Sequence, residues 1–485
     1  MKAVRVLLIS TYDLGRQPFG LASPAAWLRQ AGVEVDCADT SRQPLTDEEV
    51  RRASLVAFYL PMHTATRLSG PLIDRVRILN PEATLAAYGL YAPLNASWLR
   101  GRGVTHVLGP DAEADLVALV NPKSQIPNPK SQIPSPESRV PSPRQPRLRF
   151  IQPDRSTLPP PRRYAAVQMP DGTRRVAGNA EATRGCKHLC RHCPIVPVYG
   201  GTFRAIPLDV VLADVRAQVS EGVEHVSFGD ADFFNGPTHA RRLVERFAAE
   251  FPGTTYDVTI KIEHLLTHAD LLPLLAATGC LFVTSAVESI DDAVLAKLRK
   301  GHTRADFLRA VDLCRAARVP LSPTFVAFTP WTTVGGYLEL LEQIEALDLA
   351  DAVAPIQLAI RLLVTAESAL LELPDIRAAV DPFDAASLTW PWRHSDPDVD
   401  ALQREVAAVV ASMQQSARSE VFAAISARAR ERAGMPRRER SPRTPSCCTG
   451  RTPPHLTEAW YCCAEPTFAS DEAPEGRPTL PVPGS

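Results

Sequence analysis

Residues 183–193 read Thr-Arg-Gly-Cys-Lys-His-Leu-Cys-Arg-His-Cys and place Cys186, Cys190 and Cys193 in the spacing CxxxCxxC. Thiolates at this spacing can wrap three corners of an iron–sulfur cube and leave the fourth iron without a protein ligand. A cluster needs such an open iron if it binds and reduces a substrate. From the residues alone, the alternatives are unlinked thiols and a zinc site, to which two histidines in the stretch could contribute.

The sequence around this stretch alternates short apolar runs with helical patterns. Strands are predicted at 176–179, 225–228, 256–262, 281–287, 321–328 and 353–360, with helices between them. This pattern is typical of an incomplete (β/α)6 barrel, whose chemistry belongs at the carboxyl ends of the strands. We predict the barrel over residues 170–375 and a helical extension over 376–435.

The first 118 residues show the same alternation, beginning with the apolar run at 4–9. We therefore predict an α/β protein whose residues 1–118 form a separate doubly wound domain with a parallel sheet. Proline-rich sequence with few apolar residues follows at 119–160 and again at 436–485. We predict a disordered linker and a disordered tail there, because such segments cannot bury enough surface to offset their ordering entropy.

Composition narrows the classes of partner. The chain has 53 Lys and Arg against 54 Asp and Glu, which argues against a nucleic-acid partner held mainly by charge. It has no apolar run of about 18 residues and no signal-peptide pattern. We therefore expect a cytoplasmic protein without a membrane partner, in which clustered cysteines serve as metal ligands or redox groups.

The Thr-Arg-Gly-Cys stretch, the CxxxCxxC spacing and the predicted barrel resemble the radical S-adenosylmethionine (SAM) superfamily. The resemblance implies that the three cysteines hold a 4Fe–4S cluster whose open iron chelates SAM. Reductive cleavage would give methionine and a 5′-deoxyadenosyl radical, with electrons from a donor such as ferredoxin or flavodoxin. The substrate, a small molecule or a peptide, is not identified. One departure is His192, which stands where the family usually has an aromatic residue near the adenine; its ring can still stack.

Further residues match positions that contact SAM in this superfamily. Gly229 and Asp230 follow the second barrel strand, where the family has a glycine-rich turn and an acid for the SAM ammonium. Glu288 and Ser289 end the fourth strand and resemble a pair that contacts SAM, and Arg361 ends the sixth strand and would face the SAM carboxylate. From the residues alone, the acid can equally belong to an ordinary turn and the serine to a helix N-cap.

The doubly wound domain ahead of the barrel resembles the cobalamin-binding class. In that class a D-x-H-x-x-G loop after the first strand supplies a cobalt-ligating histidine. Here residues 10–15 read Ser-Thr-Tyr-Asp-Leu-Gly, and no histidine precedes His63. Two roles of this domain stay open. It could bind cobalamin without a histidine ligand, or it could cover the barrel mouth or bind substrate.

Residues 460–466 read Trp-Tyr-Cys-Cys-Ala-Glu-Pro and resemble the tail of the CUAEP/CCAEP-tail radical SAM (seleno)proteins. The resemblance implies a redox-active pair in which Cys463 reacts and Cys462 resolves; adjacent cysteines close only a strained, labile ring. The alternative is two free thiols on a tail. Three functions stay open: a radical SAM enzyme, a cobalamin-dependent radical SAM methyltransferase and a non-catalytic metal- or cluster-binding redox module.

Overall fold

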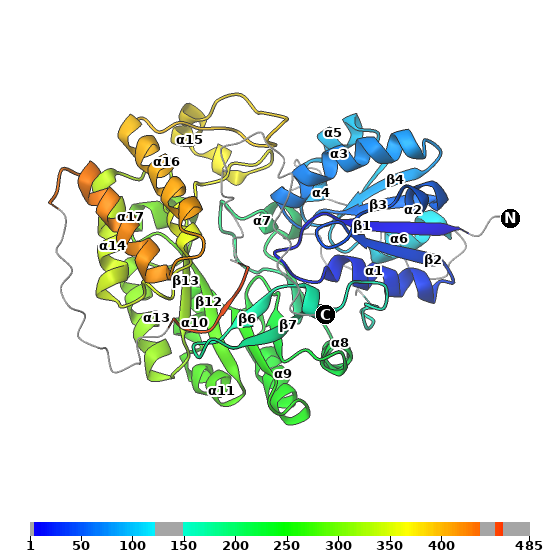
Figure 1. Cartoon of the computed structure of the whole chain (residues 1–485), viewed down its shortest axis with the longest axis horizontal. Helices are drawn as coiled ribbons and strands as arrows, with labels where there is room; N and C mark the ends of the chain where they lie inside the picture. The colour runs from blue at the N-terminus through cyan, green and yellow to red at the C-terminus, as the bar shows by residue number, and fades with distance from the viewer. Residues whose placement is uncertain (1–3, 122–148, 437–451, 459–485) are drawn as a thin grey trace.

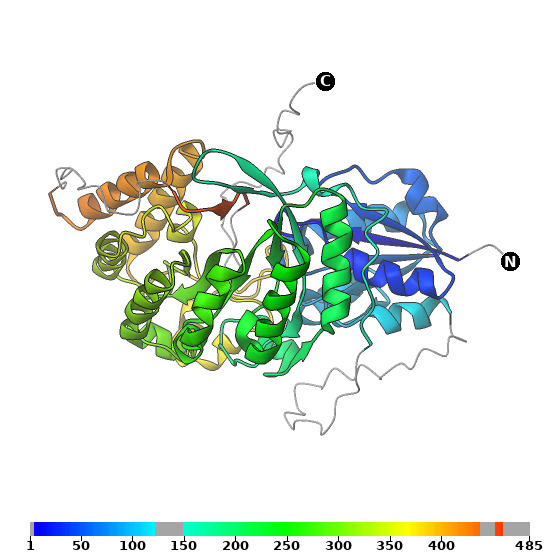
Figure 2. The ribbon, with the colours of Figure 1, turned by 90° about the horizontal axis from the view of Figure 1, so that it is seen from below.

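The computed structural model describes residues 4–121, 149–436 and 452–458. Most of the predicted linker, and Cys462 and Cys463, lie outside the described residues. An N-terminal domain and a larger barrel domain lie side by side, and helices of the C-terminal extension lie at the end of the barrel away from the N-terminal domain (Figures 1 and 2). In the described part, no helix is both long and apolar enough to span a bilayer.

The N-terminal domain has the predicted doubly wound fold. Its five parallel strands have the order β2-β1-β3-β4-β5: β1 Arg5–Ser10, β2 Glu34–Asp39, β3 Leu55–Tyr59, β4 Thr84–Tyr88 and β5 His106–Val107. The helices are α1 Phe19–Gln30, α2 Asp47–Arg52, α3 His63–Leu79, α4 Tyr91–Leu94, α5 Ala96–Gly101 and α6 Glu113–Val120. Strand β1 is apolar on both faces because Leu7 and Ile9 pack into one core and Val6 and Leu8 into the other, as expected of a central parallel strand.

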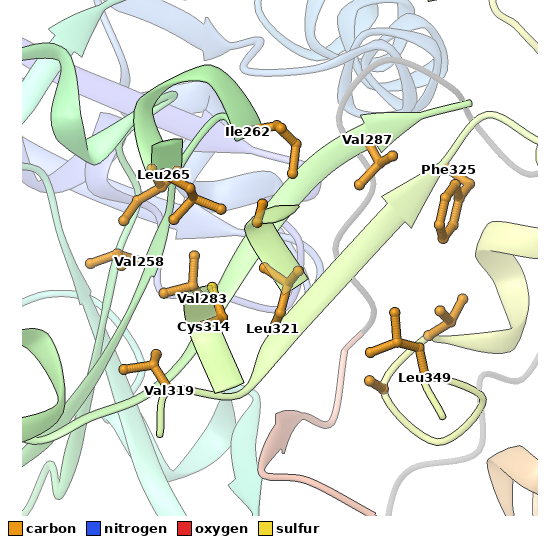
Figure 3. Packing of buried hydrophobic residues seen from close by; sticks show 14 of the residues in the cluster. Val258, Ile262, Leu265, Val283, Val287, Cys314, Val319, Leu321, Phe325 and Leu349 are labelled. Atoms are coloured by element: carbon orange, nitrogen blue, oxygen red, sulfur yellow. The ribbon is translucent and has the colours of Figure 1, made fainter. Parts of the chain in front are cut away.

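The second domain is a partial barrel built on a seven-stranded sheet with the order β13-β12-β11-β10-β7-β6-β14. Its five parallel strands are β7 Arg174–Ala180, β10 His225–Phe228, β11 Thr255–Thr259, β12 Cys280–Glu288 and β13 Leu321–Phe325. Two short antiparallel strands, β6 Ala166–Gln168 and β14 His455–Leu456, extend one edge. Side chains of the strands and helices form one continuous core, part of which Figure 3 shows.

Helices follow the barrel strands, as the sequence pattern predicts. They are α8 Leu208–Ser220, α9 Pro237–Glu250, α10 Ile262–Thr267, α11 Leu272–Ala277, α12 Asp292–Leu298, α13 Arg304–Ala316 and α14 Val334–Ala346. The predicted extension is also helical, with α15 Pro374–Ala379, α16 Pro397–Ser412 and α17 Arg418–Arg432. A hairpin of β8 Thr183–Gly185 and β9 Phe203–Ala205, together with α7 Ile195–Tyr199, carries the cysteine stretch.

The predicted sixth barrel strand is wrong. Residues 353–360 contain the 3₁₀-helix Pro355–Leu358 instead, and the sixth position is reduced to one bridge between Phe328 and Arg361. Proline explains the difference: Pro355 has no N–H for a strand ladder, and its fixed φ suits the start of a helix.

The boundaries of the predicted linker and tail are also wrong. Residues 149–160 pack between the domains, where buried Arg155 binds Asp214 of the barrel and Gln17 of the N-terminal domain, with Nη1 2.7 Å from the Gln17 Oε1 atom. Within the predicted tail, β14 pairs with β6. Both segments depend on contacts with residues far away in the sequence, which local composition does not reveal.

Candidate functional site

The three cysteines lie in a loop between β8 and α7, which we call the cluster loop (residues 186–193). Gly185, the last residue of β8, precedes the loop at φ +84°. A side chain there would collide with the Thr202 carbonyl oxygen, so only glycine fits. The next backbone N–H, that of Cys186, donates to the same carbonyl at 3.1 Å. The loop therefore continues directly from the hairpin.

The cysteine thiols have the properties expected of cluster ligands. Among the described cysteines none forms a disulfide. Burial raises the pKa of Cys186 to about 12 and also raises the pKa of Cys190, and nearby thiolates add to both shifts, Cys193 among them. Metal binding would remove this cost because coordination deprotonates thiols. Three thiols on one short loop, with Cys190 buried and Cys186 and Cys193 half-buried, fit a 4Fe–4S cluster.

His192 of the cluster loop contacts the acid at the end of strand β12. Its Nε2 atom lies 3.2 Å from Glu288 Oε1, and the Lys300 Nζ atom lies 3.3 Å from the same oxygen. All three side chains are buried. Burial opposes ionisation of Glu288, but the lysine charge and the histidine hydrogen bond outweigh it and lower the pKa of Glu288 to about 2. Lys300 belongs to the segment 297–303, whose sequence does not by itself reveal a buried charge.

The Asp230 side chain is hydrogen-bonded to residues at the start of the hairpin. Its carboxylate accepts from the Ala182 N–H at 3.1 Å and from the Thr183 hydroxyl. Burial raises its pKa to about 7. Beside it, a side chain at Gly229 would lie 3.4 Å from Arg16 of the N-terminal domain. Asp230 therefore binds the residues that begin the hairpin, and Gly229 lies near the N-terminal domain; their predicted contact with SAM stays a prediction.

A second acid of the same turn, Asp232, was missed by the sequence reasoning. Its Oδ2 atom lies 3.1 Å from His188 Nε2 and 2.6 Å from His264 Nδ1, and Lys261 Nζ lies 3.2 Å from the other ring nitrogen of His188. Burial opposes ionisation here too, but the two histidines lower the pKa of Asp232 to about 2. The donor atoms of the two histidines and the aspartate all lie within 4.8 Å of one another, so this group could also hold a metal ion.

The remaining predicted SAM contacts have protein partners in the structure. Arg361 donates to Asp400 at 2.7 Å and to the Trp392 carbonyl at 2.9 Å. The Ser289 hydroxyl accepts a hydrogen bond from the Asp291 N–H at 3.0 Å. The N-cap of helix α12 is Asp291 and not Ser289. A SAM contact by either predicted residue stays a prediction.

The loop after β1 meets the C-terminal segment 452–458. The Tyr12 hydroxyl donates to Glu458 Oε1 at 2.6 Å, and Gly15 lies so close that a Cβ there would be 3.0 Å from the same glutamate. This is the loop in which the cobalamin-binding class carries its histidine. The predicted redox pair Cys462 and Cys463 follows a few residues later, outside the described residues.

The family comparison matches the segment that carries this site. Residues 181–334 match the family model described as "Radical SAM superfamily". The chain carries a radical SAM domain. The matched residues include the cluster loop, the turn after β10 and the end of β12, so the predicted radical SAM domain is confirmed. Such a domain implies a 4Fe–4S cluster and SAM, which the three free cysteines of the cluster loop fit.

A related protein aligns with part of this chain. A tRNA-2-methylthio-N(6)-dimethylallyladenosine synthase from Fusobacterium nucleatum is 25% identical over 183 residues, 34% of this chain and 39% of that protein. The chain thus aligns with about two fifths of that relative's length.

Two solved structures share the fold. The cobalamin-dependent SAM radical enzyme OxsB with aqua-cobalamin bound has a TM-score of 0.63 at 11% identity, covering 89% of this chain and 72% of its own. The radical SAM methyltransferase TsrM from Kitasatospora setae, with cobalamin and a [4Fe-4S] cluster bound, has a TM-score of 0.54 at 18% identity, covering 71% and 70%. At these identities the likeness confirms the α/β fold.

Proposed function

We propose that this chain is a radical SAM enzyme that cleaves SAM reductively and acts on a small molecule or a peptide. The observation that carries the proposal is the short loop of three free cysteines, none of them fully exposed, inside the radical SAM domain. A 4Fe–4S cluster held by Cys186, Cys190 and Cys193 would supply the electron that yields methionine and a 5′-deoxyadenosyl radical. We further propose a cytoplasmic location and an electron donor of the ferredoxin or flavodoxin type.

Two buried acids of the barrel contact histidines of the cluster loop. His192 contacts Glu288 at one end of the loop, and His188 contacts Asp232 near the other. Both acids follow barrel strands at the edge where such barrels carry out chemistry. We propose that Gly229, Asp230, Ser289 and Arg361 line the SAM site around this loop.

We also propose that the chain belongs to the CUAEP/CCAEP-tail group, with Cys463 as the reacting thiol and Cys462 as its resolving partner. The position of Glu458 supports the proposal, since it contacts Tyr12 at the carboxyl edge of the N-terminal sheet. Cys463 follows five residues later, a reach of roughly 17 Å in extended chain.

A cobalamin-dependent methyltransferase is the second candidate. The N-terminal sheet order β2-β1-β3-β4-β5 favours it, because such sheets bind ligands where the strand order reverses, here between β1 and β3. The loop after β1 presents Tyr12 instead of a histidine, so cobalamin would bind without an imidazole from this loop. A corrinoid absorption spectrum in protein purified with added cobalamin would identify this function.

The deciding experiment is anaerobic reconstitution with iron and sulfide, followed by SAM cleavage with dithionite. We expect about four irons and 5′-deoxyadenosine from the wild type, and neither from Cys186→Ala. Cys314→Ala is the matched control because this thiol is buried in the barrel core. Bound metal with intact SAM would instead identify the non-catalytic redox module. Substrate-independent SAM cleavage that persists in Cys463→Ser would put the tail thiol after radical generation.

A further inference from the structure

Arg184, two residues before the first cluster cysteine, is buried in a network of charges from both domains. Its side chain is 9% exposed. The guanidinium lies 2.7 Å from Glu113 and 3.4 Å from Asp111 of the N-terminal domain, and 2.9 Å from Glu181 of the barrel domain. Arginine suits this position because its planar fork can bind several carboxylates at once.

Residues outside the barrel domain also contact this guanidinium, from helix α1 and from the interdomain segment. The ring of Phe19 in α1 lies 5.6 Å from its central carbon, and Phe150 of the interdomain segment lies 5.5 Å away. Ser23 of α1 donates to Glu113 at 2.6 Å and accepts from the guanidinium at 3.2 Å. The position of Arg184 is therefore set largely by residues outside the radical SAM domain.

One N-terminal acid binds both strands of the hairpin that leads into the cluster loop. Asp111 contacts Arg184 on β8 and also Arg204 on β9, at 2.5 Å. These two arginines are directly paired in the hairpin. From Arg184 the chain runs through Gly185 to Cys186, whose N–H continues the hairpin pairing. A shift of the acid would therefore move the strand that ends at the first cluster ligand.

We infer that Arg184 is a positioning residue through which Asp111 and Glu113 of the N-terminal domain fix the cluster loop for SAM binding. The inference rests on the proposed function. The two acids lie where β5 ends and α6 begins, at the carboxyl edge of the N-terminal sheet. That edge is where doubly wound domains bind ligands, so the network joins the N-terminal site to the cluster.

The test uses Arg184→Lys and Glu113→Gln in the reconstituted full chain. Arg184→Lys keeps the charge and loses the fork, whereas Glu113→Gln changes only the N-terminal partner. Asp47→Asn is the matched control, because Asp47 pairs with Arg75 at 2.6 Å within the N-terminal domain. Iron content and the EPR spectrum of the reduced cluster are measured during a SAM titration, at a temperature where circular dichroism shows each variant folded.

We expect both variants to keep the wild-type iron content, and the SAM concentration that half-converts the EPR spectrum to rise about five-fold or more. Asp47→Asn should match the wild type. Wild-type titration curves in the two variants would overturn the inference and leave the proposed function intact. If the wild type itself holds no cluster, the proposed function fails and the inference fails with it. Should Arg184→Lys not fold, the Glu113→Gln titration alone decides.

Discussion

His192 Nε2 lies 3.2 Å from Glu288 Oε1, so a residue between two cluster cysteines is tied to the last residue of a barrel strand. Glu288 holds this position at φ +69°, a conformation that costs energy for a residue with a side chain. The register of β12 against β13 shifts just before it. Two buried partners, His192 and Lys300, offset that cost and keep the carboxylate ionised.

Replacing Glu288 with Gln should destabilise the protein strongly at neutral pH. The change leaves the buried Lys300 ammonium without its carboxylate, and breaking such a buried pair costs about 3–5 kcal/mol. Because the folded-state pKa of Glu288 lies at about 2, below its usual value, its contribution is fully present above pH of about 4.5 and is lost as the pH falls towards 2.

Chemical denaturation at pH 7 and at several acidic pH values checks this prediction. The difference in free energy of unfolding between wild type and Glu288→Gln should shrink steadily below pH of about 4.5. Glu48→Gln, at an exposed surface pair, should differ from wild type by about 0.5 kcal/mol or less at any pH. A difference that stays constant through this range would contradict the assigned ion pair.

Gly185→Ala should disturb the cluster loop far more than Gly200→Ala. Both glycines have positive φ, but a Cβ at residue 185 would meet the Thr202 backbone, whereas a Cβ at residue 200 meets nothing within 4 Å. We expect a loss of more than about 2 kcal/mol of unfolding free energy and a lower iron content for Gly185→Ala. Gly200→Ala should cost about 1 kcal/mol and keep its iron. Equal effects of the two changes would contradict this interpretation.

The sequence predicts those parts of the fold that depend on local patterns. The strand near Leu7 is recognisable because both faces of the sheet demand apolar residues, and the cluster cysteines are recognisable because three ligands fall within eight residues. Local pattern misleads at residues 353–360. Their apolar content resembles that of a strand, but Pro355 has no N–H for the hydrogen bonds between strands.

The contacts that the sequence does not reveal join distant segments. Asp232 is one of two acids in a single turn, and only the fold brings it to His188 and His264. Lys300 looks like a surface charge until the barrel buries it beside Glu288. Strand β14 has two residues and no periodic pattern, so its pairing with β6 becomes visible only in three dimensions.

The hydrogen bond between Tyr12 and Glu458 should hold the C-terminal segment on the N-terminal domain. Removing the hydroxyl with Tyr12→Phe should cost about 1 kcal/mol. A double-mutant cycle with Glu458→Ala should give a coupling energy of similar size, because the two side chains contact each other directly. The free energies of unfolding of the four proteins supply the cycle. Additive effects would show that the contact contributes nothing to stability.

The segment 452–458 should detach progressively as the pH falls from about 6.5 towards about 4. Burial, with a smaller contribution from Arg418, lowers the pKa of His455 in β14 to about 4. The folded segment therefore favours the neutral ring, so its attachment is fully stable above the usual histidine pKa of about 6.5 and weakens as the pH falls towards 4. Limited proteolysis across this range should show increasing cleavage near residues 452–458.

The variant His455→Phe separates this effect from general acid unfolding. Its ring fills similar space and cannot take up a proton, so cleavage of the segment should no longer depend on pH between 6.5 and about 4. His394, which precedes α16 and lies outside the segment 452–458, gives the control His394→Phe, which should retain the wild-type pH dependence. If His455→Phe is cleaved with the same pH profile as the wild type, protonation elsewhere releases the segment.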